Sequence, residues 1–241
     1  MDEKINIQNI LFLDIETVPV VPLYDDLDEQ YQKLWEKKSR YFRKEEESPD
    51  EAFERAGIYS EFGKIICISI GLVFEKNGEK FFRTKSFSGH NEIEVLKGFN
   101  ELVEKKFSGD NHYLCAHNGR EFDFPYIARR SMIHGLKIPR HIFNASTKRP
   151  WDKDYRLLDT MEMWKFGDYK NYTSLELLAR LFDIPTPKDD IDGSMVAEVY
   201  YAENDLERIV TYCEKDVLTI AQLYLKYNYM DTIKPENIEK S

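Results

Sequence analysis

The order of apolar and polar positions predicts short strands that alternate with helices. Continuous apolar runs with the length of a buried strand occupy 10–13, 65–73 and 113–116. Asn77-Gly78 is a turn signal that would join the second run to 81–87 as a hairpin. The remaining expected elements are helices at 91–106, 121–134, 173–181, 192–201 and 205–226, and a strand at 156–159. About five strands with helices on both faces indicate an α/β fold.

The segment 21–60, after the first strand, has no strand character. Apolar residues from Leu27 to Trp35 have helical spacing, and Ser48-Pro49-Asp50-Glu51 is a helix start. Because this helical insertion begins just after the first strand, we expect it to lie near that strand's end. There it is either a cap with a solvated charged face or a clamp for substrate. The clamp would use these basic residues: Lys33, Lys37, Lys38, Arg40 and Arg43.

The 241 residues are 42% hydrophobic and 32% charged, which is typical of a soluble globular protein. No repeat or low-complexity linker divides them, so we expect a single domain over 1–228 and a polar, flexible tail at 229–241. No apolar stretch reaches the length of a membrane span, and the first four residues lack a secretory pattern. Cys67, Cys115 and Cys213 lie in apolar segments, as reduced core cysteines of a cytoplasmic protein do.

The net charge of −10 argues against a nucleic-acid partner, but the distribution of charge weakens that argument. Residues 120–156 contain nine lysines or arginines and four acids, so this stretch is +5 and the rest of the chain is −15. Aromatic residues, among them Phe122, Tyr126 and Trp151, lie between these cations. Cations for phosphates and aromatic faces for bases suit a single-stranded end, and a solvated surface over an aromatic core is the alternative.

Two carboxylates follow the first apolar run. In a strand, Asp14 and Glu16 project from the same face, roughly 7 Å apart along the chain. Neighbouring buried anions repel each other, and a hard divalent cation that prefers carboxylate oxygens relieves the repulsion. A pair of solvated acids at a strand end is the alternative, so this pair alone does not define a site.

Two later blocks place polar residues on suitable elements. Asn118-Gly119 forms a turn after a short strand and brings Asp123 near that turn. In the last helix, Tyr212 and Asp216 share one flank of the apolar stripe, and we expect Lys215 to face away. A phenol and a carboxylate four residues apart on one helix face can act on the same small volume.

Taken in order, the three blocks resemble the three motifs of the DEDD superfamily of 3′→5′ exonucleases. Phe12-Leu13-Asp14-Ile15-Glu16-Thr17 is similar to the Asp-x-Glu motif, Asn118 through Asp123 to Asn-x-x-x-Phe-Asp, and Tyr212 through Asp216 to Tyr-x-x-x-Asp. This is the tyrosine branch, because the histidine branch would have His at position Thr211. The resemblance spans 12–216 and points to the proofreading domains of family B DNA polymerases. It implies an RNase H-like fold: a mixed five-stranded sheet flanked by helices, with the helical insertion after the first strand.

The resemblance also implies a two-metal mechanism with Mg²⁺ or Mn²⁺. Asp14, Glu16 and Asp216 would hold the ion that binds the attacking water. Asp14 would bridge to a second ion, which Asp123 would hold directly or through water. Tyr212 would orient the water through its hydroxyl; base catalysis is the alternative, although an unperturbed tyrosine is a poor base at neutral pH.

Three further residues are expected to bind the substrate. By resemblance, Thr17 and Phe122 would pack against the terminal nucleotide, and Asn118 would donate a hydrogen bond near the scissile group. A plain core role is the alternative for Phe122.

These features favour a metal-dependent 3′→5′ exonuclease that releases nucleoside 5′-monophosphates from DNA, single-stranded in our interpretation. An exoribonuclease of the same fold is the alternative within this class, and a catalytically silent nucleic-acid-binding module is the alternative outside it. An RNase H-type endonuclease is disfavoured, because it does not place Asp and Glu two apart on the first strand. No polymerase domain follows in the sequence, so we expect any polymerase or repair partner to act in trans.

Overall fold

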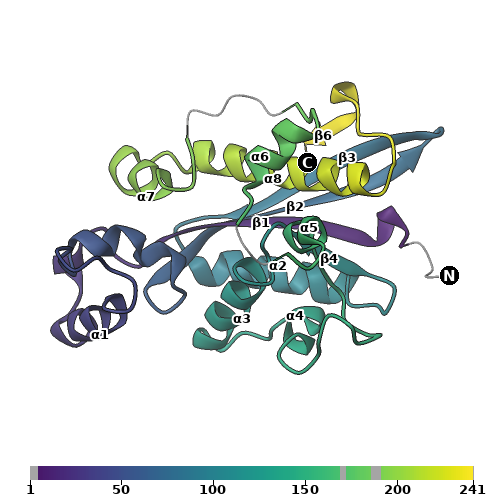
Figure 1. The fold of residues 1–241 in the computed structure, drawn as a ribbon. Helices are drawn as coiled ribbons and strands as arrows, with labels where there is room; N and C mark the ends of the chain where they lie inside the picture. The colour runs from purple at the N-terminus through teal and green to yellow at the C-terminus, as the bar shows by residue number, and fades with distance from the viewer. Residues whose placement is uncertain (1–4, 169–171, 186–190, 241) are drawn as a thin grey trace.

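The computed structural model describes residues 5–168, 172–185 and 191–240, and a six-stranded mixed sheet lies at its centre (Figure 1). The strands, in their order across the sheet, are β5 (Leu157–Asp159), β4 (Tyr113–Ala116), β1 (Ile10–Pro19), β2 (Gly63–Lys76), β3 (Glu79–Ser88) and β6 (Ile238–Lys240). The β1–β2 and β2–β3 pairs are antiparallel, whereas β1–β4, β4–β5 and β3–β6 are parallel. The expected α/β fold with a mixed sheet is therefore confirmed, with one strand more than expected.

Helices cover both faces of this sheet (Figure 1). The α-helices are α1 (Glu29–Ser39), α2 (Glu92–Lys106), α3 (Asp123–Ile133), α4 (Arg140–Asn144), α5 (Thr160–Lys165), α6 (Leu175–Leu181), α7 (Val196–Glu198) and α8 (Leu206–Tyr227). Short 3₁₀ segments occupy Ile7–Asn9, Tyr24–Asp26, Glu51–Ile58 and Pro235–Asn237, and a π-helical turn continues α7 over Val199–Glu203. Within the described ranges, no helix is both long and apolar enough to cross a membrane.

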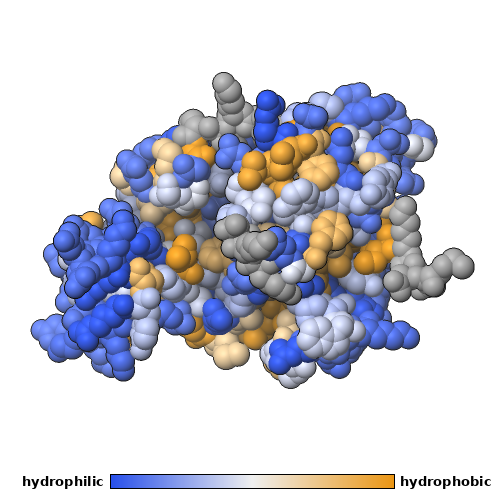
Figure 2. All heavy atoms as spheres, in the orientation of Figure 1, coloured by the Kyte–Doolittle hydropathy of each residue, from blue (hydrophilic) through white to orange (hydrophobic). Residues whose placement is uncertain are grey.

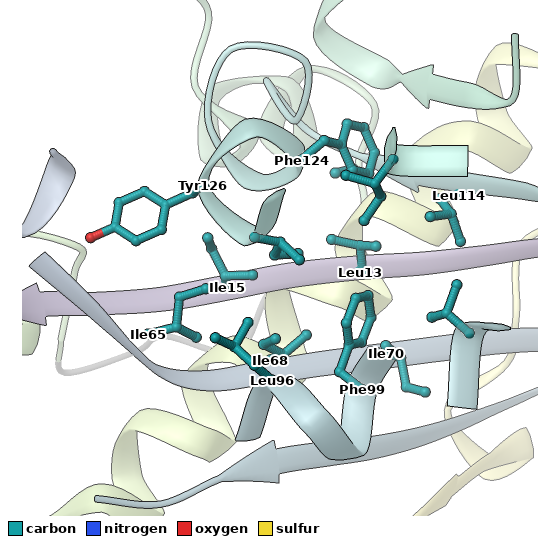
Figure 3. Packing of buried hydrophobic residues seen from close by; sticks show 14 of the residues in the cluster. Leu13, Ile15, Ile65, Ile68, Ile70, Leu96, Phe99, Leu114, Phe124 and Tyr126 are labelled. Carbon is teal, nitrogen blue, oxygen red and sulfur yellow. The ribbon is translucent and has the colours of Figure 1, made fainter. Parts of the chain in front are cut away.

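Alternation along β1 separates two hydrophobic layers, because successive side chains of a strand point to opposite faces. Leu13 and Ile15 pack with residues of β2, α2 and α3, and Figure 3 shows them between Ile68, Phe99 and Phe124. Residues of the opposite parity, including Ile10 and Phe12, pack against α8 instead. The even-numbered positions of β1 therefore face α8, and this parity includes Asp14 and Glu16.

A glycine allows α8 to lie close to the sheet. A Cβ atom built on Gly71 of β2 would lie 2.2 Å from the Cζ atom of Phe82 and 2.8 Å from the Cγ1 atom of Val217. Both distances are too short for carbon atoms, so any larger residue would push α8 or β3 outward. The side chains that α8 directs at β1 owe their position partly to this contact.

The insertion predicted over 21–60 forms a lobe at the α1 end of the molecule, where Figure 2 shows a mainly hydrophilic surface. Its interior is an aromatic cluster around Trp35, which is fully buried and donates a hydrogen bond to the carbonyl oxygen of Pro49. The Tyr126 hydroxyl of α3 donates a 2.8 Å hydrogen bond to the carbonyl oxygen of Gly57. This bond fixes the last part of the insertion beside the sheet.

The structure corrects the expectation of a flexible tail at 229–241. Residues Ile238–Lys240 pair with β3 as a parallel edge strand, and the side chain of Ile233 is buried against the α8 layer. An ion pair of 2.6 Å between Arg83 and Glu239 and a hydrogen bond from Asn237 to the carbonyl oxygen of Lys80 hold the segment. Edge strands expose unpaired backbone groups, and this segment covers those of β3.

Candidate active site

Asp14 and Glu16 lie where β1 loses one of its neighbours. The pairing of β1 with β4 ends at Phe12, whereas its pairing with β2 continues to Pro19. The two carboxylates are therefore in the middle of a longer strand than the apolar run predicted, beside an opening in the sheet. A β-bulge directly after Glu16 bends the strand at this point.

A cleft of about 1080 Å³ lies at this opening, between β1, the β4–α3 loop and α8. The structure brings all eight predicted site residues together along its wall: Asp14, Glu16, Thr17, Asn118, Phe122, Asp123, Tyr212 and Asp216. They come from segments up to 200 residues apart in the chain, so the sheet topology gathers them rather than any local sequence pattern.

The β4–α3 loop positions Asp123 through a carboxylate that the motifs did not reveal. Asp159, at the end of β5, accepts hydrogen bonds of 3.0 Å from the backbone N–H groups of both Asn118 and Arg120. It also caps α5 by accepting from the N–H group of Met161. An Asp at a strand end before a helix is a capping signal, but the sequence does not indicate that its second oxygen orients a distant loop.

Asp123 begins α3, where the positive end of the helix dipole favours an anion. Only 2% of its surface is exposed, and its Oδ1 atom has no hydrogen-bond partner among the described residues. Burial raises the pKa of Asp123 from its ordinary value to about 8, against the opposing effect of hydrogen bonds from backbone N–H groups. A buried carboxylate oxygen without a partner is a position that a cation can fill.

Helix α8 supplies the opposite wall. Tyr212, Lys215, Asp216 and Thr219 all line the cleft, as residues at positions i, i+3, i+4 and i+7 of one helix face do. The expectation that Lys215 faces away is therefore wrong: a residue three positions after Tyr212 lies only about 60° from it around the helix. The Tyr212 hydroxyl interacts with Asp216, and burial followed by the nearby carboxylates raises its pKa well above 10.

The acidic side chains of the cleft affect one another. Burial raises the pKa of Asp14 well above its usual range, and Asp123, Glu16 and Asp216 raise it further. Burial, Asp216 and Asp123 act on Glu16 in the same direction. Four carboxyl groups that repel one another in a partly buried cleft are the complement of bound divalent cations. The oxygen atoms of Asp14 and Glu16 lie within 4.8 Å of each other and of the Cys213 Sγ atom.

Two histidine and cysteine positions have structural contacts. Both ring nitrogens of His117 are occupied, Nδ1 by the Thr160 hydroxyl and Nε2 by the carbonyl oxygen of Thr173, each at 2.9 Å. This histidine therefore anchors the start of α6 beside the cleft. The three cysteines are free and buried, as predicted, and Cys213 donates to both the backbone and the carboxylate of Asp14.

Other parts of the wall carry no motif. The insertion contributes Glu54, Arg55 and Ile58, whereas the five cations considered for a substrate clamp do not line the cleft. Exposed Tyr172 and the segment 191–195 form the rim on the α6–α7 side. These residues line the cleft because of long-range packing, and neither spacing nor composition marks them.

Comparisons with known proteins agree with this architecture. A family described as a predicted 3′–5′ exonuclease related to the exonuclease domain of PolB matches residues 58–240, a range that includes Asp123, Tyr212 and Asp216 and begins after Asp14 and Glu16. The chain is 24% identical over 184 residues to DNA polymerase 1 of Pyrococcus abyssi, covering 68% of this chain and 22% of that protein. A DNA polymerase of Methanocaldococcus jannaschii is 37% identical over 67 residues, 27% of this chain and 4% of that protein.

The solved structure of the family B DNA polymerase of Pyrobaculum calidifontis superimposes with a TM-score of 0.54 and 18% identity, covering 90% of this chain and 24% of that one. This likeness supports the RNase H-like fold expected from the motifs. The chain spans about a fifth of the length of the Pyrococcus relative, so the likeness is to one part of a polymerase. The chain belongs to the family of predicted 3′–5′ exonucleases related to the exonuclease domain of PolB.

Proposed function

We propose that this exonuclease removes nucleotides from the 3′ end of single-stranded DNA and releases nucleoside 5′-monophosphates in a reaction that depends on two divalent cations. The observation that carries the proposal is the cleft, in which Asp14, Glu16, Asp123 and Asp216 raise one another's pKa values. DNA is favoured over RNA because the related proteins are named as DNA polymerases.

The residues of the cleft fit Mg²⁺ or Mn²⁺. The donors are carboxylate oxygens, which hard cations prefer, and the Oδ1 atom of Asp123 lacks any other partner among the described residues. Asp14, Glu16 and Asp216 would hold one ion, and Asp14 and Asp123 the other. Such a pair of ions supplies an activated water and stabilises charge on the attacking and leaving oxygens.

Tyr212 would position the attacking water rather than deprotonate it. Its raised pKa keeps the phenol protonated at neutral pH, so the hydroxyl can hold the water by a hydrogen bond while its own partner is Asp216. Positioning alone contributes to rate, because it removes the entropy cost of orienting the nucleophile.

Three residues would hold the terminal nucleotide. Phe122 is half-buried, packs against Tyr126 with ring centroids 5.4 Å apart, and still lines the cleft, so an apolar edge remains for a sugar or base. Asn118 has a left-handed φ of 59°, and its buried Oδ1 atom has no partner in the described part of the chain. Thr17 lines the cleft beside Glu16.

The test uses DNA and RNA oligonucleotides of one sequence, labelled at the 5′ or the 3′ end, with Mg²⁺, Mn²⁺ or a chelator. We expect 5′-labelled DNA to give a ladder that shortens with time, 3′-labelled DNA to give labelled mononucleotide at once, and the chelator to stop both. Asp14→Ala should remove the activity, and Asp231→Ala, at an exposed acid outside the cleft, should not.

Three outcomes contradict the proposal. Internal fragments from 3′-labelled DNA would indicate an endonuclease. Turnover in the chelator would remove the metal requirement. Faster hydrolysis of RNA than of DNA would assign the chain to the exoribonuclease alternative.

A further inference from the structure

The β4–α3 loop separates the cleft from a second, smaller cavity. Asn118 and Phe122 line the cleft, while Arg120, between them in the chain, lines a cavity of about 240 Å³ together with Arg129 and Tyr155. Alternate residues of one loop therefore line two hollows, and the surface leads from the active site to the region of α3, α4 and the loop 145–156.

Ion pairs distinguish the nine cations of the basic stretch 120–156. Four of them are neutralised by carboxylates: Arg130 by Glu92, Lys137 by Glu104, Arg140 by Asp110 and Lys148 by Asp154. Arg156 donates to backbone carbonyl oxygens. In the described part of the chain, the other four form no ion pair: Arg120, Arg129, Arg149 and Lys153.

The orientation of Arg120 is fixed although it has no anion. Its guanidinium lies 5.2 Å from the centre of the Tyr155 ring, and its Nε atom is buried without a hydrogen-bond partner. A buried, unpartnered donor on a cation is costly, and a phosphate oxygen is a ligand that satisfies it. Arg129 is exposed on the same cavity, so two guanidinium groups converge there.

Aromatic side chains project from the same region. Trp151 is 80% exposed in the loop 145–156, and Phe143 at the end of α4 is 56% exposed. An exposed tryptophan offers a flat surface on which an unpaired base can stack, and stacking of this kind tolerates any base. A chain with an overall charge of −10 has little other attraction for a polyanion, so a local +5 region matters more here than in a basic protein.

We propose that this surface, defined by Arg120, Arg129, Arg149, Trp151 and Lys153, binds the single-stranded nucleic acid upstream of the nucleotide that is removed. The inference rests on the proposed function, because it takes the cleft as the place where the 3′ end lies. Arg120 and Arg129 bind one phosphate at the second cavity, Arg149 and Lys153 bind phosphates beyond it, and Trp151 stacks on a base.

Direct binding tests this surface without requiring hydrolysis. The affinity of a fluorescent 20-nucleotide single-stranded DNA is measured by anisotropy in chelator at 50 and 200 mM salt. The triple variant Arg129→Gln, Arg149→Gln, Lys153→Gln is compared with Lys76→Gln, Lys85→Gln, Lys97→Gln, which removes the same charge from exposed lysines of β2, β3 and α2. Circular dichroism checks that both variants are folded.

Each lost phosphate contact lowers the salt slope by about 0.7 for a single strand, so three contacts account for a roughly 20-fold smaller loss of affinity over this fourfold change in salt. We expect the first triple variant to show this smaller loss and the second to resemble the wild type. Trp151→Ala should weaken single-strand binding about fivefold or more and leave blunt duplex binding unchanged, whereas Tyr229→Ala, at a residue that is 99% exposed, should change neither.

The inference is overturned if the two triple variants have the same salt slope, or if wild-type protein does not bind the strand in chelator. Equal loss on single strand and duplex in Trp151→Ala would also overturn the stacking role. Failure of the proposed function has a different signature: the strand binds and the salt slopes differ as expected, but no nucleotide is released with Mg²⁺ or Mn²⁺.

Discussion

The Sγ atom of Cys213 lies 3.4 Å from the Oδ2 atom of Asp14, inside the group of acidic side chains that would hold a metal. A thiol is a poor ligand for Mg²⁺ but a good one for soft cations such as Cd²⁺. We therefore expect Cd²⁺ to bind with sulfur in its coordination sphere and to inhibit hydrolysis with Mg²⁺.

The measurement is the ultraviolet sulfur-to-cadmium charge-transfer band in a titration of the metal-free protein. Cys213→Ser should remove the band and relieve the inhibition. Cys115→Ser is the matched control, because Cys115 is also free and buried but belongs to the core between β4 and α8. A band that persists in Cys213→Ser, or that disappears in Cys115→Ser, would place the cadmium elsewhere.

The stability of the metal-free protein should fall as pH rises. Asp123 has a pKa of about 8 in the folded state and an ordinary value near 3.8 when exposed, so between these values the folded state binds the extra proton. Its contribution is therefore complete below pH 4 and is lost as pH rises toward 8. Thermal unfolding in chelator from pH 5 to 8 measures this decline.

Asp123→Asn should flatten that decline and raise the Tm in chelator at pH 8, because an uncharged amide avoids the cost of a buried anion. Mg²⁺ should raise the Tm of the wild type at pH 8 and have a smaller effect on the variant. Asp231→Asn removes an exposed carboxyl outside the cleft and should leave the pH dependence unchanged. A decline of equal slope in Asp123→Asn would assign it to other groups.

Local signals account for what the sequence predicted. Asn77 and Gly78 have φ angles of 55° and 79°, as the hairpin signal requires, and the apolar stripe of the last helix gave the extent of α8 within a residue or two. The motif residues were identified by spacing. The parity of β1 then determines that Asp14 and Glu16 face α8, because a strand directs alternate side chains to one face.

The remaining features depend on contacts that no local pattern encodes. The strand β6 contains one apolar residue, Ile238, and forms because the edge of β3 accepts it and Arg83 pairs with Glu239. Tyr172 lines the cleft because His117 fixes the adjacent Thr173, a contact between segments 56 residues apart. Such long-range hydrogen bonds complete the site, whereas sequence patterns identify only its centre.

Tyr212 and Asp216 should differ in the size of their effects. Tyr212→Phe removes a hydroxyl that positions water, so kcat should fall about 10²-fold, the usual cost of losing one hydrogen-bond donor at a reacting centre. Asp216→Ala removes a metal ligand and should lower hydrolysis below detection. Steady-state kinetics with saturating Mg²⁺ compares the two, and Thr211→Ala, on the same turn of α8 but outside the cleft lining, is the control. Equal losses would show that Tyr212 does more than position the water.

Asp159 should act as a positioning residue for the β4–α3 loop. Asp159→Asn keeps one oxygen, for the Asn118 and Met161 N–H groups, and replaces the oxygen that accepts from Arg120 N with a donor. We expect a loss of about 1–3 kcal/mol in the free energy of unfolding and a weaker dependence of rate on Mg²⁺, because Asp123 loses its alignment. Asp28→Asn, at the N-cap of α1, should change neither, since Asn also caps helices.

Gly71→Ala should displace α8 from the sheet and thereby separate the two halves of the site. The added methyl group would lie 2.2 Å from the Phe82 ring and 2.8 Å from Val217, one residue after Asp216. Overpacking of this kind costs about 1–3 kcal/mol of stability, and the outward shift should also raise the Mg²⁺ concentration required for half-maximal rate. Gly89→Ala adds the same group where the nearest atoms are 3.9 Å away, so it should alter neither quantity. If Gly71→Ala unfolds at a lower temperature but needs no more Mg²⁺ than the wild type, then the distance between α8 and β1 does not control metal binding.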